Sequence, residues 1–154
     1  MLALVQARFL EHPGERIKLI IAFCFRGILR IVAPFPPYDD VIMKKAFQLI
    51  VECYSRLHDT QNSNFDRRSV ILDTMAKIRS YVVMLYVQKD DLILQICQFF
   101  FTNIIEHHHE EAKANMQDIL SSLLVEGDVI HKQLWTKLLV IGGRKRLSHQ
   151  MPMS

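Results

Sequence analysis

Apolar residues recur at intervals of three and four along most of this chain, which is the spacing of helices with a buried face. The segments between the apolar runs contain turn residues and show no strand-like alternation. The pattern predicts an all-α protein of about seven helices. We expect them at about residues 2–11, 17–32, 41–57, 66–86, 91–106 and 111–125, with a seventh that begins near Asp128, carries Trp135 and fades after Ile141.

Several expected boundaries rest on residues that stop or start a helix. Pro13-Gly14 ends the first helix, and three prolines within residues 34–37 end the second, because proline lacks the backbone donor of a helix. Asp39 or Asp40 is expected to cap the third helix, and Asp66 the fourth, since a carboxylate at that position accepts a hydrogen bond from a free amide.

The expected helices differ in how much polar surface they carry. The third helix has a clear polar side, whereas the only polar stripe of the second is Lys18, Ala22, Arg26 and Arg30 at spacing four. We therefore expect the second helix to be buried on most sides. The residues expected to face inward from the third, fourth and sixth helices are Met43, Phe47, Ile50, Cys53, Tyr54 and Leu57; Ile71, Leu72, Met75, Ile78, Val82 and Leu85; and Met116, Ile119, Leu120, Leu123 and Leu124.

Pairs of neighbouring helices form hairpins that begin near residues 39 and 91. Their period of about 50 residues is close to the ~40 to 47 of HEAT-type repeats. Each hairpin of such an array has an apolar face that only its neighbour covers. The sequence thus predicts a HEAT-type helical repeat segment, an α-solenoid, over residues 1–141, with a flexible basic tail over residues 142–154.

Composition and charge narrow the class of protein further. With 154 residues, 50% hydrophobic and 23% charged, the chain fits one globular domain or a fragment of a larger one, and five Gly and five Pro are few for a turn-rich β fold. The net charge of +3 equals the contribution of Arg144–Arg146 alone. Direct nucleic-acid binding is therefore expected to be weak or absent. We expect Arg67, Arg68, Lys77 and Arg79 on an ordinary solvated helix face.

Neither a membrane span nor a secretory signal is expected. The longest uncharged run, residues 92–105, is shorter than the ~20 residues that a bilayer requires, and no basic segment precedes an apolar stretch at the start. The three cysteines Cys24, Cys53 and Cys97 lie among apolar residues without paired spacing. A reducing compartment is the simpler interpretation.

Two groups of residues invite a catalytic or metal-binding interpretation. His107–His109 are adjacent, so on a helix their rings point about 100° apart, whereas helical zinc ligands need spacing i and i+4. Cys53 or Cys97 could act as a nucleophile with His58 or His109 as base, but burial raises the pKa of a thiol and lowers its reactivity. We expect a solvated turn and core packing instead, with no catalytic residue, metal or cofactor.

The segment Ala33-Pro34-Phe35-Pro36-Pro37-Tyr38 is a stronger candidate for function. Its polyproline-like backbone would display Phe35 and Tyr38 with little entropy to lose on binding a partner. The alternative is a stiff connector between two helices, because proline also stabilises a loop by restricting the unfolded chain.

The same segment carries a family resemblance. Residues 28–57, which read Ile-Leu-Arg-Ile-Val-Ala-Pro-Phe-Pro-Pro-Tyr-Asp-Asp and continue to Phe-Gln-Leu-Ile, are similar to the N-terminal HEAT region of a family of sister-chromatid cohesion regulators. That family, called precocious dissociation of sisters five, has Arg-Ile-x-Ala-Pro-Asp-Ala-Pro-Tyr at this place. The resemblance continues through residues 69–80, 98–100 and 121–128, and covers about residues 8–141.

The resemblance implies a non-catalytic scaffold that works in the nucleus. Its implied partners are chromosomal cohesin, bound through the kleisin subunit, and the releasing factor wings apart-like; its implied roles are maintenance and release of cohesion and, in plants, recombinational repair. Ala33, Pro34, Pro37 and Tyr38 match the family position by position, so these four are the candidate partner-binding residues.

This chain departs from the family at Phe35 and Pro36, which stand where the family has an acidic residue and alanine. Family members are also far longer than 154 residues. Two alternatives therefore stay open: a truncated paralogue or fragment without independent function, and a generic helical-repeat interaction module. A small hydrolase or metal enzyme is a third, weaker class.

Overall fold

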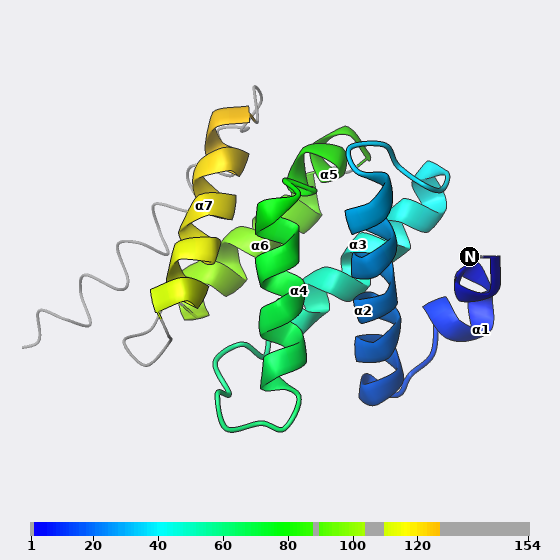
Figure 1. The fold of residues 1–154 in the computed structure, drawn as a ribbon, viewed down its shortest axis with the longest axis horizontal. Helices are drawn as coiled ribbons and strands as arrows, with labels where there is room; N and C mark the ends of the chain where they lie inside the picture. Colours follow the sequence, from blue (N-terminus) through cyan, green and yellow to red (C-terminus); the bar gives the residue numbers. More distant parts are fainter. Residues whose placement is uncertain (1, 88–89, 104–109, 127–154) are drawn as a thin grey trace, which may run out of the picture.

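The computed structural model describes residues 2–87, 90–103 and 110–126, and within these ranges every regular element is helical. The elements are a 3₁₀-helix η1 (Leu2–Val5) and the α-helices α1 (Ala7–Leu10), α2 (Glu15–Val32), α3 (Asp40–Tyr54), α4 (Phe65–Lys77), α5 (Tyr81–Val87), α6 (Asp90–Asn103) and α7 (Glu110–Glu126) (Figure 1). The prediction of an all-α fold is confirmed.

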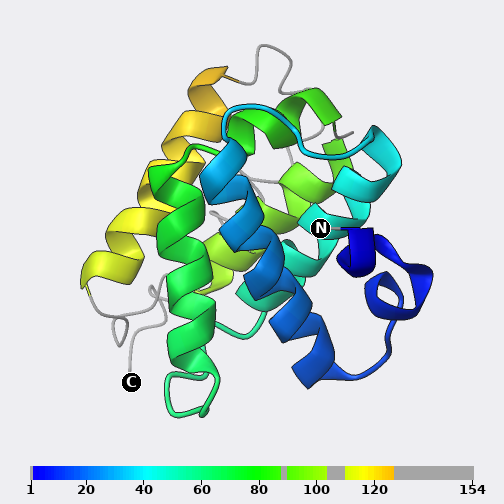
Figure 2. The ribbon, with the colours of Figure 1, turned by 45° about the vertical axis from the view of Figure 1, so that its right-hand side comes forward.

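The helices form two layers. Helices α2, α4 and α7 lie side by side in the first layer, and α3 packs on α5 and α6 in the second (Figure 2). The first-layer helices begin at residues 15, 65 and 110 and the second-layer helices α3 and α6 at residues 40 and 90. The repeat is therefore 45 to 50 residues long, as the sequence predicted, and the arrangement is that of a HEAT-type solenoid.

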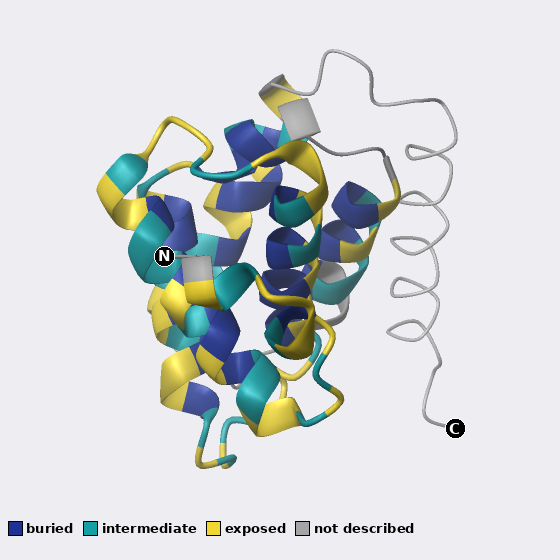
Figure 3. Cartoon of the chain, turned by 90° about the vertical axis from the view of Figure 1, so that its right-hand side faces the viewer, coloured by how far each residue is buried: buried dark blue, intermediate teal, exposed yellow. Residues whose placement is uncertain are grey.

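The core lies between the two layers and is rich in aromatic side chains. Phe25 of α2, Phe47 and Tyr54 of α3 and Phe100 of α6 are all fully or almost fully buried. Figure 3 shows how buried, intermediate and exposed positions alternate along the helices. The rings of Tyr54 and Phe100 are 5.0 Å apart between centroids, which joins the second-layer helices of successive repeats. All six inward residues predicted for the third helix are buried.

Helix starts agree with the sequence prediction at α3 and differ at α4. Asp39 caps α3, because its Oδ1 accepts a hydrogen bond of 2.9 Å from the backbone N–H of Ile42. At α4 the N-cap is Asn64, which makes no side-chain capping bond, and Asp66 lies within the first turn. The prediction of Asp66 as the cap is wrong, because the helix begins one residue before it.

The single helix predicted over residues 66–86 is in fact two helices. At the end of α4, Arg79 adopts a positive φ of 51°. The Arg79 N–H donates to the Ala76 carbonyl at 3.2 Å, and the Ser80 N–H donates to the Met75 carbonyl at 3.4 Å. These two bonds form a Schellman C-cap, a turn that usually has glycine at its left-handed position. Because Arg79 occupies that position, no glycine marks the break in the sequence.

Helix α2 is less buried than the sequence predicted. Ile20 and Ile31 are 46% and 81% exposed, and Cys24 is exposed as well, contrary to the expectation of apolar surroundings. These residues face away from α3 and α4, the helices on which α2 packs most. The outer side of α2 in the described part of the chain is therefore an apolar stripe in contact with solvent.

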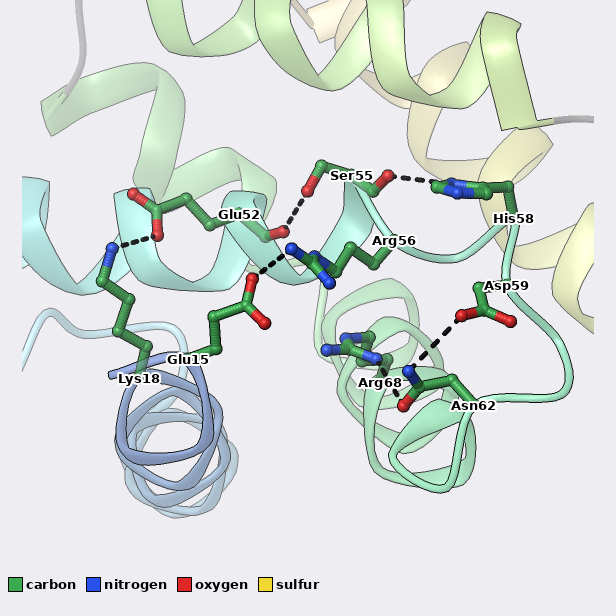
Figure 4. Close-up of polar contacts among 9 residues, drawn as sticks. All are labelled: Glu15, Lys18, Glu52, Ser55, Arg56, His58, Asp59, Asn62 and Arg68. Atoms are coloured by element: carbon green, nitrogen blue, oxygen red, sulfur yellow. Dashed lines mark hydrogen bonds and ion pairs between the residues drawn. The ribbon is translucent and has the colours of Figure 1, made fainter. Parts of the chain in front are cut away.

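The polar stripe of α2 lies toward neighbouring helices instead. Lys18 forms an ion pair of 3.1 Å with Glu52 of α3 (Figure 4). Arg26 donates from Nη1 to Thr74 Oγ1 of α4 at 3.2 Å, and its guanidinium lies over the ring of Phe23 at 4.3 Å. Lys18 and Arg26 therefore bridge α2 to its neighbours, whereas Arg30, the last residue of the stripe, is exposed to solvent.

One member of the basic group predicted on a solvated face is buried. Arg68 is only 5% exposed, and its Nη1 donates to Asn62 Oδ1 at 3.4 Å (Figure 4). Arg67 and Lys77 are exposed as expected, and Lys77 pairs with Asp73 at 2.8 Å. The expectation of a solvated face is therefore wrong for Arg68, which lies between α4 and the end of α3.

Several predictions fall outside the described residues. They are the end of the fifth expected helix beyond Asn103, the His107–His109 turn, the seventh helix with Trp135, and the tail from residue 142. The side chain of Leu124, predicted to face inward, is also outside the described part. Among the described helices, none is long and apolar enough to cross a membrane.

Candidate partner-binding site at the proline loop

The proline loop, residues 33–38, follows the end of α2 at Val32, and its prolines at 34, 36 and 37 have no backbone N–H to continue the helix. The Ala33 N–H donates to the Leu29 carbonyl at 2.9 Å, and the Phe35 N–H donates to the Val32 carbonyl at 3.0 Å, which closes a tight turn. The Ala33–Pro34 peptide bond is cis. The turn between Val32 and Phe35 directs the Phe35 side chain away from the core, and this side chain is 74% exposed to solvent.

The loop forms one wall of an apolar cavity of about 360 Å³. The opposite wall comes from the junction between α4 and α5, in the next repeat. The residues that line the cavity are Leu29, Ala33, Pro34, Phe35, Ile78, Arg79, Ser80, Val82 and Val83. Because aliphatic side chains dominate this set, the cavity can accept an apolar side chain of a partner.

The α4–α5 junction supplies the charge of the site. Arg79 is exposed, its Nε donates to the Tyr81 hydroxyl at 2.7 Å, and its guanidinium lies 5.9 Å from the centre of the Tyr81 ring. Ser80 is buried and its Oγ donates to the Met75 carbonyl at 3.3 Å. A non-glycine residue with positive φ costs about 1–2 kcal/mol, so surrounding contacts hold Arg79 at the rim of the cavity.

The four candidate residues divide into two pairs. Ala33 and Pro34 are exposed and line the cavity, whereas Pro37 and Tyr38 are half-buried and do not. The Tyr38 ring packs edge-on against Phe25, with centroids 5.9 Å apart and planes at 80°. Burial raises the pKa of Tyr38 above its usual value. The expectation of a displayed Tyr38 is wrong, because its ring anchors the loop to the core.

The cysteines considered as nucleophiles are part of the core. Cys53 and Cys97 are 6% and 1% exposed, and burial raises their thiol pKa to about 12 and about 11. His58 is exposed, with Nδ1 3.1 Å from the Ser55 carbonyl oxygen, and His109 lies outside the described residues. In the described ranges, no three His, Cys, Asp or Glu side chains come together as metal ligands.

Thiol labelling should separate the exposed cysteine from the two buried ones. At pH 8 the folded chain should react rapidly with a thiol reagent at Cys24 and at neither Cys53 nor Cys97, because raised pKa values leave the buried thiols protonated there. Unfolding in denaturant should make all three reactive. Mass spectrometry of labelled peptides gives the count, and rapid native labelling of Cys97 would contradict the packing of α6.

Comparison with known proteins places the chain in a family. Residues 2–141 match the family model described as sister chromatid cohesion protein PDS5. The chain is 40% identical over 144 residues to sister chromatid cohesion protein PDS5 homolog A of Arabidopsis thaliana, covering 94% of this chain and 9% of that protein. It is 30% identical over 146 residues to homolog B of Homo sapiens, covering 92% of this chain and 10% of that protein.

A solved structure has the same fold. In a structure of the Pds5–Scc1 complex, one chain superposes with a TM-score of 0.75 at 22% sequence identity, covering 86% of this chain and 20% of that one. The chain thus spans about a tenth of the length of the two curated relatives above. The extent of the family match and the shared fold show that the chain belongs to the sister chromatid cohesion protein PDS5 family.

Proposed function

We propose that this chain is a non-catalytic scaffold segment that binds a protein of the cohesin machinery at the proline loop. The observation that carries the proposal is the position of Phe35, 74% exposed beside an apolar cavity shared by two successive repeats. An exposed aromatic on a constrained loop loses little entropy on binding, and aromatic side chains dominate the energy of many interfaces.

The first partner we propose is the kleisin subunit of cohesin. The solved structure that shares the fold is a Pds5 complex with Scc1, a kleisin, which supports this choice. The second is the releasing factor wings apart-like, for which the support is the family resemblance of the loop. A nuclear location and roles in the maintenance and release of cohesion and in DNA repair belong to the same proposal.

The ligand we expect is an extended segment with an apolar anchor. The anchor would enter the cavity between Pro34 and Val83, and Phe35 would cover it. Where the family has an acidic residue, Phe35 offers a hydrophobic contact that salt does not screen. Capture by this chain should therefore depend less on salt than capture by the variant Phe35→Asp with Pro36→Ala, which has the loop of the family.

Phe35→Ala should weaken capture about tenfold, because truncating an exposed interface aromatic commonly costs 1–2 kcal/mol or more. Titration of the purified kleisin subunit, and separately of wings apart-like, onto immobilised chain measures the change in Kd. Ile31→Ala is the matched control, since Ile31 is 81% exposed one turn before the loop and does not line the cavity. Its Kd should stay that of the parent.

Two outcomes would contradict the proposal in different ways. If a folded parent chain captures neither protein, the fragment has no independent partner-binding function, which is the alternative that the sequence left open. If capture occurs and Phe35→Ala binds as tightly as the parent, the scaffold function stands and the loop is not its site.

A further inference from the structure

A buried arginine lines a small pocket at the opposite end of α2 from the proline loop. Arg68, near the start of α4, is only 5% exposed, whereas its neighbour Arg67 is exposed. The pocket has a volume of about 200 Å³ and lies where the first turns of α2, the last turns of α3 and the start of α4 meet. Because a guanidinium stays protonated in proteins, a full positive charge lies in the wall of this pocket.

Arg68 uses little of its hydrogen-bonding capacity within the described residues. Its Nη1 donates to Asn62 Oδ1 over a long 3.4 Å, and the same oxygen accepts a shorter bond of 2.9 Å from the Asn64 N–H. The other nitrogens of Arg68 are turned away from Asn62 (Figure 4). A guanidinium has five N–H donors, so most of those on Arg68 have no partner in the described part of the chain.

No carboxylate in the described ranges neutralises Arg68. The two carboxylates that line the pocket form ion pairs with other cations at its rim (Figure 4). Glu15 pairs with Arg56, and Glu52 pairs with Lys18 at 3.1 Å. The lining residues thus carry three positive charges and two negative charges, and the positive charge left over is the buried one.

The thiol of Cys53 does not supply the missing negative charge. It lines the same pocket, but burial raises its pKa to about 12, so the thiol is protonated and neutral at pH 7. A charge removed from water is destabilising unless an opposite charge or several hydrogen bonds compensate it. An anion that enters the pocket would provide both, because a guanidinium can donate two parallel hydrogen bonds to one carboxylate.

The size and charge of the pocket favour a single carboxylate on a side chain. Pockets that hold whole small molecules have volumes of about 300–1,000 Å³, so a pocket of about 200 Å³ suits one side chain. One excess positive charge matches a monoanion, and Glu15 and Glu52 at the rim repel a second negative charge. Leu19 and Leu49 provide an apolar part of the wall, on which methylene groups can pack.

We propose that this pocket binds a glutamate side chain of a partner protein, with its carboxylate on the guanidinium of Arg68. The two carboxylate oxygens accept hydrogen bonds from the free N–H groups of Arg68, and the methylene groups contact Leu19 and Leu49. The pocket adjoins the start of α2 and the proline loop follows its end, so this is a second contact surface. The inference does not depend on the partner proposed for the proline loop.

Titration of the full chain with blocked amino acids tests this proposal on the unmodified protein. The probes are N-acetyl-glutamate methylamide, which has one carboxylate, and N-acetyl-glutamine methylamide, which has nearly the same shape and no charge. Nuclear magnetic resonance of the Arg68 Nε–H group at low salt follows the binding of each probe. We expect a saturable shift with the glutamate probe and a Kd about tenfold higher with the glutamine probe, because hydrogen bonds to charged acceptors are stronger.

Two arginine variants then assign the binding to one residue. Arg68→Leu should abolish saturable binding of the glutamate probe, measured on the backbone N–H groups of Leu49 and Cys53. Arg67→Leu is the matched control, because Arg67 is the preceding residue of α4, is exposed and does not line the pocket. It should keep the Kd of the parent chain. Circular dichroism checks that both variants are folded, and the comparison of the two probes on the parent chain needs neither variant.

Three results would overturn the proposal. Equal affinity of the parent chain for the two probes would mean that the pocket does not recognise a carboxylate. Binding of the glutamate probe to folded Arg68→Leu as tightly as to the parent would place the anion elsewhere on the chain. Tighter binding of inorganic phosphate or succinate than of the glutamate probe would assign the pocket to a small dianion instead of a protein side chain.

Discussion

Phe25→Ala should cost about 3–5 kcal/mol of the free energy of unfolding, the usual range for truncating a buried phenylalanine. Phe25 has 0% exposure, lies on the side of α2 that faces the second layer, and supports the ring of Tyr38 at 5.9 Å. A cavity at this place removes contacts from both layers at once. Because the free energy of unfolding of small domains is only about 5–15 kcal/mol, the variant should be partly unfolded at a modest concentration of denaturant.

Chemical denaturation followed by circular dichroism measures this loss. Ile31→Ala is the control on the same helix, and with 81% exposure it should change the free energy of unfolding by less than about 0.5 kcal/mol. One variant removes a buried side chain of α2 and the other removes an exposed one. Equal losses from both would mean that α2 is not packed as described.

Phe100→Ala should destabilise the chain by a similar 3–5 kcal/mol, because Phe100 joins the second-layer helices α3 and α6 of successive repeats. Its ring is 5.0 Å from Tyr54, which has 2% exposure. An aromatic pair of this kind contributes about 0.5–1.5 kcal/mol beyond its burial. The loss should therefore exceed the value expected from buried area alone.

A double-mutant cycle isolates the contact between the two repeats. Tyr54→Leu, Phe100→Leu and the double variant keep the core filled, so their unfolding free energies should give a coupling energy of about 0.5–1.5 kcal/mol. Strictly additive single effects would show that α3 and α6 do not meet at these rings. That result would contradict the packing of α3 on α6 in the second layer.

Features set by local chemistry were predictable from the sequence. Asp39 precedes an amphipathic run, and the structure has it as the N-cap of α3 with a 2.9 Å bond to Ile42. The inward face of α3 followed from helical spacing, because the polar residues Lys44, Gln48, Glu52 and Arg56 recur every four residues on the opposite side. The repeat length also followed, since helix starts repeat every 45 to 50 residues.

Features set by tertiary contacts were not predictable. The break between α4 and α5 depends on Arg79 at φ 51°, a conformation for which arginine carries no sequence signal. Arg68 is buried because α3 and the loop before α4 close over it, and a charged residue on a polar helix face gives no hint of that. The exposure of Ile20 and Ile31 on the outer side of α2 likewise depends on which helices pack against α2.

The candidate site shows the same division. The proline loop was identifiable from its composition, and the exposure of Phe35 agrees with the prediction. The sequence could not identify the opposite wall, residues 78–83, because that wall exists only where the next repeat packs against the loop. The expectation of a displayed Tyr38 side chain was wrong for a related reason, since only the fold brings Phe25 beside it.

Amide hydrogen exchange, with and without bound partner, tests most directly whether this repeat segment binds through the proline loop and the α4–α5 junction. Exchange should be measured first on the full chain alone, and then on the full chain saturated with the kleisin subunit or with wings apart-like. We predict slower exchange at residues 32–35 and 78–83, the two walls of the cavity, with α6 unchanged. Binding accompanied by protection confined to other helices, with both walls unchanged, would contradict the account.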